Sequence, residues 1–159
     1  MNSLEKHYSS DLFYFLGFIK GSSVAEIACA TILSVRNAKL PSYSVAYWTA
    51  TEYYNRGYAT EALVAVTAFA FSILSAKRVS TGHAITNTAS QRVIEKAGFN
   101  RESIVALGYQ MPKSEEFLDG VVYSLISASG LRNANHEFGQ IEIDSLLLKG
   151  IEDSRCKFT

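Results

Sequence analysis

Cysteine and proline are scarce in this sequence of 159 residues, which contains two of each. Cys29 and Cys156 lie far apart and form no CxxC pair, which argues against a metal knuckle and fits a reducing compartment. We therefore expect two free thiols. The three histidines, His7, His83 and His136, show no spacing typical of metal ligands, so we expect no metal site.

Net charge and long apolar runs are also lacking. Fifteen lysines and arginines balance fifteen aspartates and glutamates, which argues against broad attraction to nucleic acid or an anionic membrane. A charged ligand must therefore be bound by a few local groups. The longest apolar stretch, residues 62–74, is too short to cross a bilayer core of about 30 Å, and the opening MNSLEKHYSS lacks the pattern of a signal peptide. We expect a cytoplasmic protein with no nucleic-acid or membrane partner.

Apolar residues make up 48% of the chain, which is enough to bury one sizeable core and predicts a single globular domain. The predicted elements are strands near residues 12–19, 24–35 and 43–49, a buried helix at 60–74, a strand at 78–84, a short helix within 87–99, and strands at 102–109 and 120–126. The first two strands flank the short connection KGSS and should form a hairpin. The strand, helix, strand, helix order that follows implies a crossover and a partly parallel sheet.

The stretch YYNRGYATEAL, residues 53–63, places small side chains and a cation where the buried helix begins. The first N–H groups of a helix have no intrahelical partner and, with the helix dipole, attract an anion such as a diphosphate. Gly57 and Ala59 would let the backbone approach this ligand closely, and Arg56 would add a positive charge at the rim. The alternative is a tight turn in which Gly57 only relieves strain and Thr60 caps the helix.

A second motif follows further along the chain, with NTAS at residues 87–90 and EKAGF at residues 95–99. Together with YNRGYA at residues 54–59, it resembles the GNAT superfamily of acetyl-CoA-dependent N-acetyltransferases, in particular the RimJ/RimL-like branch that acetylates N-termini of ribosomal proteins. In that family a Q/R-x-x-G-x-G/A segment binds the CoA pyrophosphate, and YNRGYA departs from it only at Tyr54. The resemblance covers residues 12–126. It implies an α/β (α+β) fold with a mixed, mostly antiparallel central sheet flanked by helices.

The resemblance also implies a site for acetyl-CoA as acyl donor, with no metal. The backbone of residues 48–50 would pair with the pantetheine arm and polarise the thioester carbonyl, and Asn87 would hydrogen-bond the same arm. Ser90 would protonate the departing thiolate, because Ile94 stands where many relatives have a tyrosine. The implied CoA-binding residues are Trp48, Thr49, Ala50, Arg56, Gly57, Tyr58, Ala59, Thr60, Asn87 and Ser90.

Structural roles stay open for several of these residues. Asn87 is alternatively only the cap of its helix, and Ser90 only a polar residue of the first turn. At least one of Tyr47 and Trp48 should pack in the core or at its rim, since side chains alternate across a strand.

The general base is not evident from the sequence. Ser44 stands where relatives often have a glutamate, and Gly108 precedes Tyr109 where some relatives have Glu-Tyr. The candidates are Glu52, Tyr109 and Asp119, and the predicted catalytic residues are Ser90, Tyr109 and Glu52. An α-amino group has a pKa near ~8 and a lysine side chain one near ~10.4, so a weak base favours a protein N-terminus or another amine of low pKa as acceptor. The alternative is a catalytically impaired module that binds acyl-CoA or a protein partner.

Relative to the family, the predicted domain is N-terminally truncated or circularly permuted. A GNAT domain begins with a strand and two helices that wall the acceptor groove, whereas few residues precede Leu12 here. We interpret residues 1–126 as the acyl-CoA-binding core and 127–159 as a linker with a relocated first strand at 141–149, which resembles the family's opening phrase. This strand would pair beside residues 12–19, within one chain or across a homodimer; the alternative is an unrelated amphipathic tail.

Overall fold

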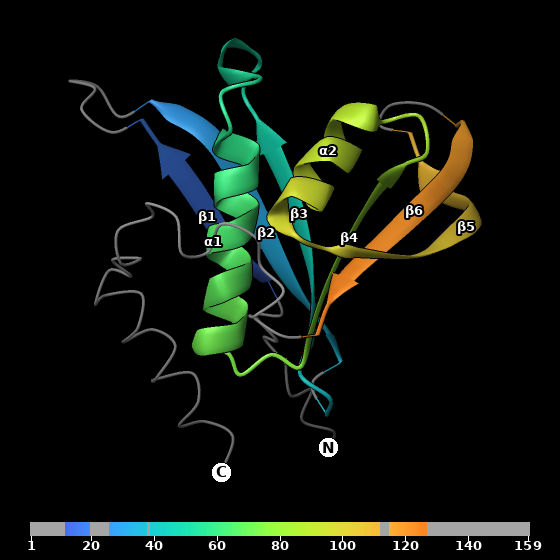
Figure 1. The fold of residues 1–159 in the computed structure, drawn as a ribbon, viewed down its shortest axis with the longest axis horizontal. Helices are drawn as coiled ribbons and strands as arrows, with labels where there is room; N and C mark the ends of the chain where they lie inside the picture. Colours follow the sequence, from blue (N-terminus) through green and yellow to red (C-terminus); the bar gives the residue numbers. More distant parts are fainter. Residues whose placement is uncertain (1–11, 20–25, 38, 112–114, 127–159) are drawn as a thin grey trace, which may run out of the picture.

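The computed structural model describes residues 12–19, 26–37, 39–111 and 115–126. The elements are β1 (Leu12–Phe18), β2 (Ile27–Asn37), β3 (Ser42–Thr49), the 3-10 helix η1 (Thr51–Tyr53), α1 (Tyr58–Ser72), β4 (Arg78–Ala84), α2 (Thr88–Ala97), β5 (Asn100–Gln110) and β6 (Phe117–Leu125). The strands form one sheet in the order β1-β2-β3-β4-β6-β5, in which β3 and β4 are parallel and all other neighbours are antiparallel (Figure 1). This mixed, mostly antiparallel sheet with two helices confirms the predicted α/β fold class.

The first two strands form the predicted hairpin. β1 pairs antiparallel with β2 along its whole length. Phe13 and Phe15 point toward α1 and contact Phe69 edge-on, with ring centroids 6.3 and 5.3 Å from that ring. On the other face of β1 the alternate side chains are 46–66% exposed; these are Leu12, Tyr14, Leu16 and Phe18. β1 therefore has one apolar face in the core and one facing solvent, and no described strand pairs with its outer edge.

Both α-helices lie on the same face of the sheet (Figure 1). α1 packs against β1, β2 and β3, and α2 packs against α1 and β4. Side chains from every layer are almost fully buried between them, among them Leu63, Phe69, Val79, Ile94 and Tyr123. Burial of each such apolar side chain contributes about 1.5–3 kcal/mol, so this core holds the helices and the sheet together.

The helix ends follow local signals, with one correction. α2 begins after Asn87, whose Oδ1 accepts a hydrogen bond from Ser90 N at 3.0 Å, and ends at Gly98, whose φ of 96° is left-handed. Both ends are as predicted. α1 runs over residues 58–72 rather than 60–74. Its N-cap is Gly57, with a φ of 89°, so the alternative in which Thr60 caps the helix is wrong.

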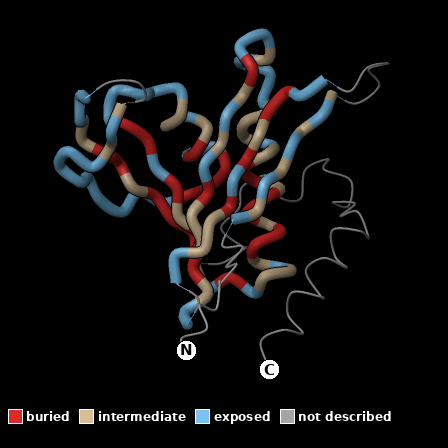
Figure 2. Tube along the Cα trace, turned by 180° about the vertical axis from the view of Figure 1, so that it is seen from behind, coloured by how far each residue is buried: buried red, intermediate tan, exposed pale blue. Residues whose placement is uncertain are grey.

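β5 contains a bulge where it passes β6. The pairing register shifts between Val105 and Tyr109, and Leu107 has a positive φ of 51°. Asp119 Oδ1 accepts a hydrogen bond from Leu107 N at 3.0 Å and stabilises this conformation. β5 is exposed along nearly its whole length (Figure 2). Asp119, one of the candidate bases, therefore has a structural partner in the bulge.

Several predictions concern residues outside those the structure describes. The linker at 127–159, with the strand predicted at 141–149, lies there, and so do Cys156, His7 and His136. The division into a core and a relocated strand therefore stays a prediction. Cys29 lies within the described residues, where it is buried and free.

Candidate functional site

β3 and β4 are joined at one end and diverge at the other (Figure 1). Their parallel pairing joins residues 42–44 to residues 78–80. Beyond it, Thr81 Oγ1 donates to Val45 O at 2.9 Å, and this is the last hydrogen bond between the two strands, both of which are described in full. β3 continues to Thr49 alongside β2, so its edge toward β4 has no strand partner there.

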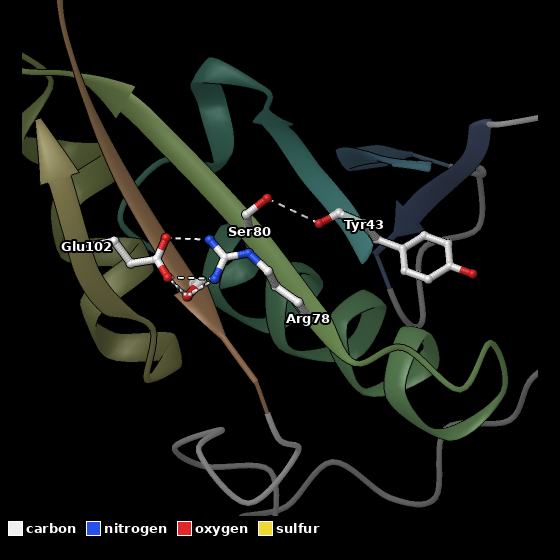
Figure 3. A network of polar contacts seen from close by, with 5 residues as sticks. Tyr43, Arg78, Ser80 and Glu102 are labelled. Atoms are coloured by element: carbon white, nitrogen blue, oxygen red, sulfur yellow. Dashed lines mark hydrogen bonds and ion pairs between the residues drawn. The ribbon is translucent and has the colours of Figure 1, made fainter. Parts of the chain in front are cut away.

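The closed end is reinforced by a polar network on β4, β5 and β6 (Figure 3). Arg78 forms a two-pronged ion pair with Glu102. Ser124 Oγ accepts from Arg78 Nη1 at 3.0 Å and donates to Glu102 Oε1 at 2.6 Å. The bonds from Arg78 and Ser124 lower the pKa of Glu102 from its usual 4.5 to about 2. Ser80 Oγ donates to Tyr43 O at 3.2 Å, which ties this end of β4 to β3 as well.

At the open end, the backbone groups of β3 point alternately toward β2 and toward the opening. Ala50 N donates to Ala28 O at 2.9 Å, whereas Val45 O accepts from β4. Since the backbone groups of successive residues in a strand point to opposite edges, those of Tyr47 and Thr49 face the opening. Thr49 Oγ1 is buried and has no hydrogen-bond partner among the described residues. Of the three residues expected to bind through their backbone, Thr49 is the one turned toward the opening.

The first turn of α1, which follows the open end of β3 along the chain, has room for a ligand. No side chain caps this turn, and a Cβ built on Gly57 would meet no atom within 4 Å. The first N–H groups, those of Tyr58, Ala59 and Thr60, have no partner within the helix. With the helix dipole, these groups form a local site for an anion.

Aromatic contacts fix the loop before α1. Tyr53 donates through its hydroxyl to Glu26 Oε2 at 2.6 Å, and this bond raises the pKa of Tyr53. The Tyr53 ring contacts Tyr58 edge-on at 6.1 Å, and the Arg56 guanidinium lies over it, 5.5 Å from the centroid. Asn55 adopts a positive φ of 60°. The loop therefore holds Arg56 just before the first turn of α1, through contacts that the motif does not reveal.

α2 meets β3 at the open end through two hydroxyls. The Tyr47 hydroxyl oxygen lies 2.6 Å from Ser90 Oγ and 3.2 Å from Ser90 O, and its single proton can be donated to either oxygen. Burial raises the pKa of Tyr47 to about 12, although its bond to Ser90 lowers it. Its neighbour Trp48 is 56% exposed, on the opposite face of the sheet. Tyr47 was not expected in the site, but its spacing of two residues from the buried Val45 puts both on the helix-covered face.

Both predicted motifs therefore contribute to the open end, but the candidate bases do not join them. Among the described residues, Glu52, Tyr109 and Asp119 form no hydrogen bond with Ser90 or Tyr47. Glu52 is exposed in η1. Tyr109 is half-buried in β5, and Asp119 supports the bulge.

Of the three histidines, His83 lies within the described residues, and it is buried beside this region. It is 3% exposed, its Nδ1 lies 2.8 Å from Ala84 O, and its ring lies 5.6 Å from the ring of Tyr123. Its Nε2 has no hydrogen-bond partner in the described part of the chain. Across the same residues, no three histidine, cysteine, aspartate or glutamate side chains gather as metal ligands would.

No described helix has the length and apolar character needed to span a bilayer.

Comparison with known proteins adds independent findings. The family model "Acetyltransferase (GNAT) domain" matches residues 4–100. The chain is similar to the "Probable N-acetyltransferase YjcK" of Bacillus subtilis, with 28% identity over 100 residues, which are 63% of this chain and 55% of the relative. It therefore spans about half the length of this curated relative.

Two solved structures share the fold. A point mutant of spermidine N-acetyltransferase SpeG from Vibrio cholerae superposes with a TM-score of 0.68 at 15% identity, over 80% of this chain and 72% of that one. Mycobacterium smegmatis RimJ in complex with CoA-disulfide superposes with a TM-score of 0.61 at 21% identity, over 66% of this chain and 50% of that one.

Proposed function

The chain belongs to the GNAT family of acetyltransferases, and we propose that it binds acetyl-CoA and transfers the acetyl group to a primary amine. The observation that carries the proposal is the uncapped first turn of α1 beside Gly57, at the end of the sheet where β3 and β4 diverge. RimJ, which shares this fold, was solved with a CoA derivative, and this supports the choice of ligand.

The described residues fit the chemistry of acetyl-CoA. A diphosphate would accept hydrogen bonds from the first-turn N–H groups of α1, with Arg56 adding charge, and the open space at Gly57 admits it without a clash. The pantetheine arm carries amides, which would pair with the backbone groups of Thr49 that face the opening. Asn87 uses only its Oδ1 in the helix cap, so its amide N–H groups stay available to the same arm.

Acetyl-CoA supplies an acetyl group activated as a thioester, and the chain must supply groups for the carbonyl oxygen and the departing sulfur. We assign the carbonyl side to the backbone of Thr49, which faces the opening. We assign the sulfur side to Ser90, because it lies at the start of α2 and has a hydroxyl held at the open end. No metal takes part in this proposal.

The acceptor we propose is an amine of low pKa, such as a protein N-terminus. Near pH 7.5 about a quarter of α-amino groups are already neutral, whereas about one lysine side chain in a thousand is. Such an acceptor places little demand on a base, which agrees with the lack of hydrogen bonds from Glu52, Tyr109 and Asp119 to the Tyr47–Ser90 pair. A water relay from one of these residues would then suffice.

The test is calorimetry with acetyl-CoA, followed by thiol release with peptides that present a free N-terminus or only a lysine. We expect saturable binding, and thiol release that is faster with the free α-amine than with lysine. Absence of binding at millimolar acetyl-CoA would overturn the proposal. Equal thiol release with both peptides would refute the preference for an N-terminal acceptor but not the acetyl transfer itself.

The second candidate is an acyl-CoA-binding module without catalysis. It is favoured because, among the described residues, none of the candidate bases forms a hydrogen bond with the Tyr47–Ser90 pair. It predicts tight binding with no thiol release above the rate of spontaneous hydrolysis for any amine tested.

A further inference from the structure

We infer that Tyr47 is a positioning residue that holds the Ser90 hydroxyl as a hydrogen-bond donor to the leaving sulfur of acetyl-CoA. The inference rests on the proposed function and deepens it. It concerns a contact between β3 and α2 that joins residues 43 apart in the sequence. Neither motif includes Tyr47.

The contact fixes Ser90 on several sides. Ser90 N donates to Asn87 Oδ1 at 3.0 Å, and the Tyr47 hydroxyl oxygen lies 2.6 Å from Ser90 Oγ and 3.2 Å from Ser90 O. A serine in the first turn of a helix can otherwise rotate its hydroxyl onto nearby backbone groups. The distance of 2.6 Å is near the short end for O–H···O bonds, so Tyr47 restricts this rotation.

Acidity decides which hydroxyl donates. Only one proton can lie between the two oxygens, and a phenol is a stronger acid than an aliphatic alcohol. Tyr47 has a single hydroxyl proton, which cannot fully serve both Ser90 Oγ at 2.6 Å and Ser90 O at 3.2 Å. The shorter contact and the acidity of the phenol together favour donation to Ser90 Oγ. The proton of Ser90 is then free for a ligand atom in the opening, and the bond from Tyr47 polarises Ser90 into a better donor.

The acidity of Tyr47 also decides whether the pair donates a hydrogen bond to the sulfur or transfers a proton to it. Burial holds the pKa of Tyr47 at about 12, whereas a free thiol has a pKa near ~8.5. Moving a proton from Tyr47 through Ser90 to the sulfur would therefore be unfavourable by about a thousandfold. Both hydroxyls keep their protons and stabilise the sulfur as an anion. As the N–C bond forms and the C–S bond breaks, the sulfur takes the bonding electron pair, the amine loses its proton to water, and solvent later protonates the thiolate.

The test compares four forms of the full chain with the unmodified one. Tyr47→Phe and Ser90→Ala each remove one hydroxyl, and the double variant removes both. The matched control is Tyr123→Phe, which removes another tyrosine hydroxyl from the core, 3.4 Å from Glu95 Oε1. Thermal unfolding of each variant establishes that it is folded. The first readout needs no turnover: the pKa of the thiol of bound CoA, followed by the ultraviolet absorbance of the thiolate.

We expect the thiol of bound CoA to titrate about one unit below free CoA in the unmodified chain and in Tyr123→Phe. Its pKa should return to the free value in Ser90→Ala and most of the way in Tyr47→Phe. In turnover, kcat should fall about tenfold in either single variant, with KM for acetyl-CoA changed less than about twofold. The double variant should be no slower than Ser90→Ala, because the two hydroxyls act as one unit.

Three results would overturn the inference. In the first, Tyr47→Phe leaves both the thiol pKa and kcat unchanged while Ser90→Ala alters them, which reduces Tyr47 to a packing residue. In the second, CoA binds but its thiol pKa is the same in every form. The Tyr47–Ser90 pair would then not contact the sulfur, and the proposed function would still stand. In the third, CoA binds to no form, which overturns the proposed function and this inference with it.

Discussion

The two ends of the β3–β4 pair are built from similar polar side chains that have opposite surroundings. At the closed end, Arg78, Glu102 and Ser124 bond one another, and hydroxyls of β4 bond the carbonyls of β3. At the open end, Thr49 Oγ1 has no partner among the described residues, and the first turn of α1 has no capping side chain. The bonded side chains of the closed end stabilise the fold, whereas the open end leaves the first-turn N–H groups of α1 available to a ligand. Three changes test this division, and a fourth tests the outer edge of β1.

The largest expected effect comes from filling the open end. Gly57→Val should weaken acetyl-CoA binding by about a hundredfold or more, because its side chain would occupy the space now open at Gly57 and strain a φ of 89°. Calorimetry measures the affinity.

The matched control for Gly57→Val is Gly98→Ala, which introduces a side chain at a similar left-handed φ of 96° but at the C-terminal end of α2. The left-handed φ should cost both variants about 1–2 kcal/mol of stability, and Gly98→Ala should lose more because Gly98 is buried whereas Gly57 is exposed. Only the change at Gly57 should abolish binding. Retained affinity in Gly57→Val would mean that the anion site lies elsewhere.

The outer edge of β1 is also unpaired among the described residues, and the side chains exposed on this strand are apolar. If residues 141–149 pair there, the double change Ile141→Asp with Ile143→Asp should lower the free energy of unfolding by about 2–3 kcal/mol. Denaturant unfolding measures this loss. The control reverses charge on the alternate positions, Glu142→Lys with Asp144→Lys. Equal, small effects of both pairs would refute the relocated strand.

A smaller effect is expected at the last link before the strands diverge. Thr81→Val keeps the shape of the side chain but removes the buried bond to Val45 O, which should cost about 1–2 kcal/mol of unfolding free energy. Affinity for acetyl-CoA should change less than about threefold, since the ligand groups lie beyond this point. A loss of affinity larger than the loss of stability would show that the closed end also shapes the site.

The smallest effect concerns the exposed ion pair. The pKa of Glu102 is lowered to about 2 in the folded chain, so its contribution is present above the usual 4.5 and is lost as the pH falls toward 2. Glu102→Gln should therefore reduce stability at neutral pH by less than about 1 kcal/mol, because both partners are partly exposed. It should also flatten the decline of stability between pH 4.5 and 2. Glu115→Gln is the control, and an identical acid profile for the two variants would exclude this role.

Local motifs predicted the fold class, the hairpin, the crossover and both ends of α2. Asn87 and Gly98 act within one turn of their own helix, so their neighbours in sequence are sufficient to assign them. The start of α1 was missed by two residues because Thr60 is a common cap type, whereas the observed cap is Gly57. Of the candidate bases, only Tyr109 lies at a family position, and Asp119 supports a bulge that periodicity does not reveal.

Short-range chemistry therefore accounts for where the helices start and stop and for the open turn at Gly57, because those groups satisfy or leave unsatisfied the backbone of the same few residues. The folded chain was needed to join Tyr47 to Ser90 across 43 residues and Arg78 to Glu102 across 24. Such contacts depend on how β3, β4 and α2 pack against one another. The spacing of residues along the chain does not give the distances between these elements.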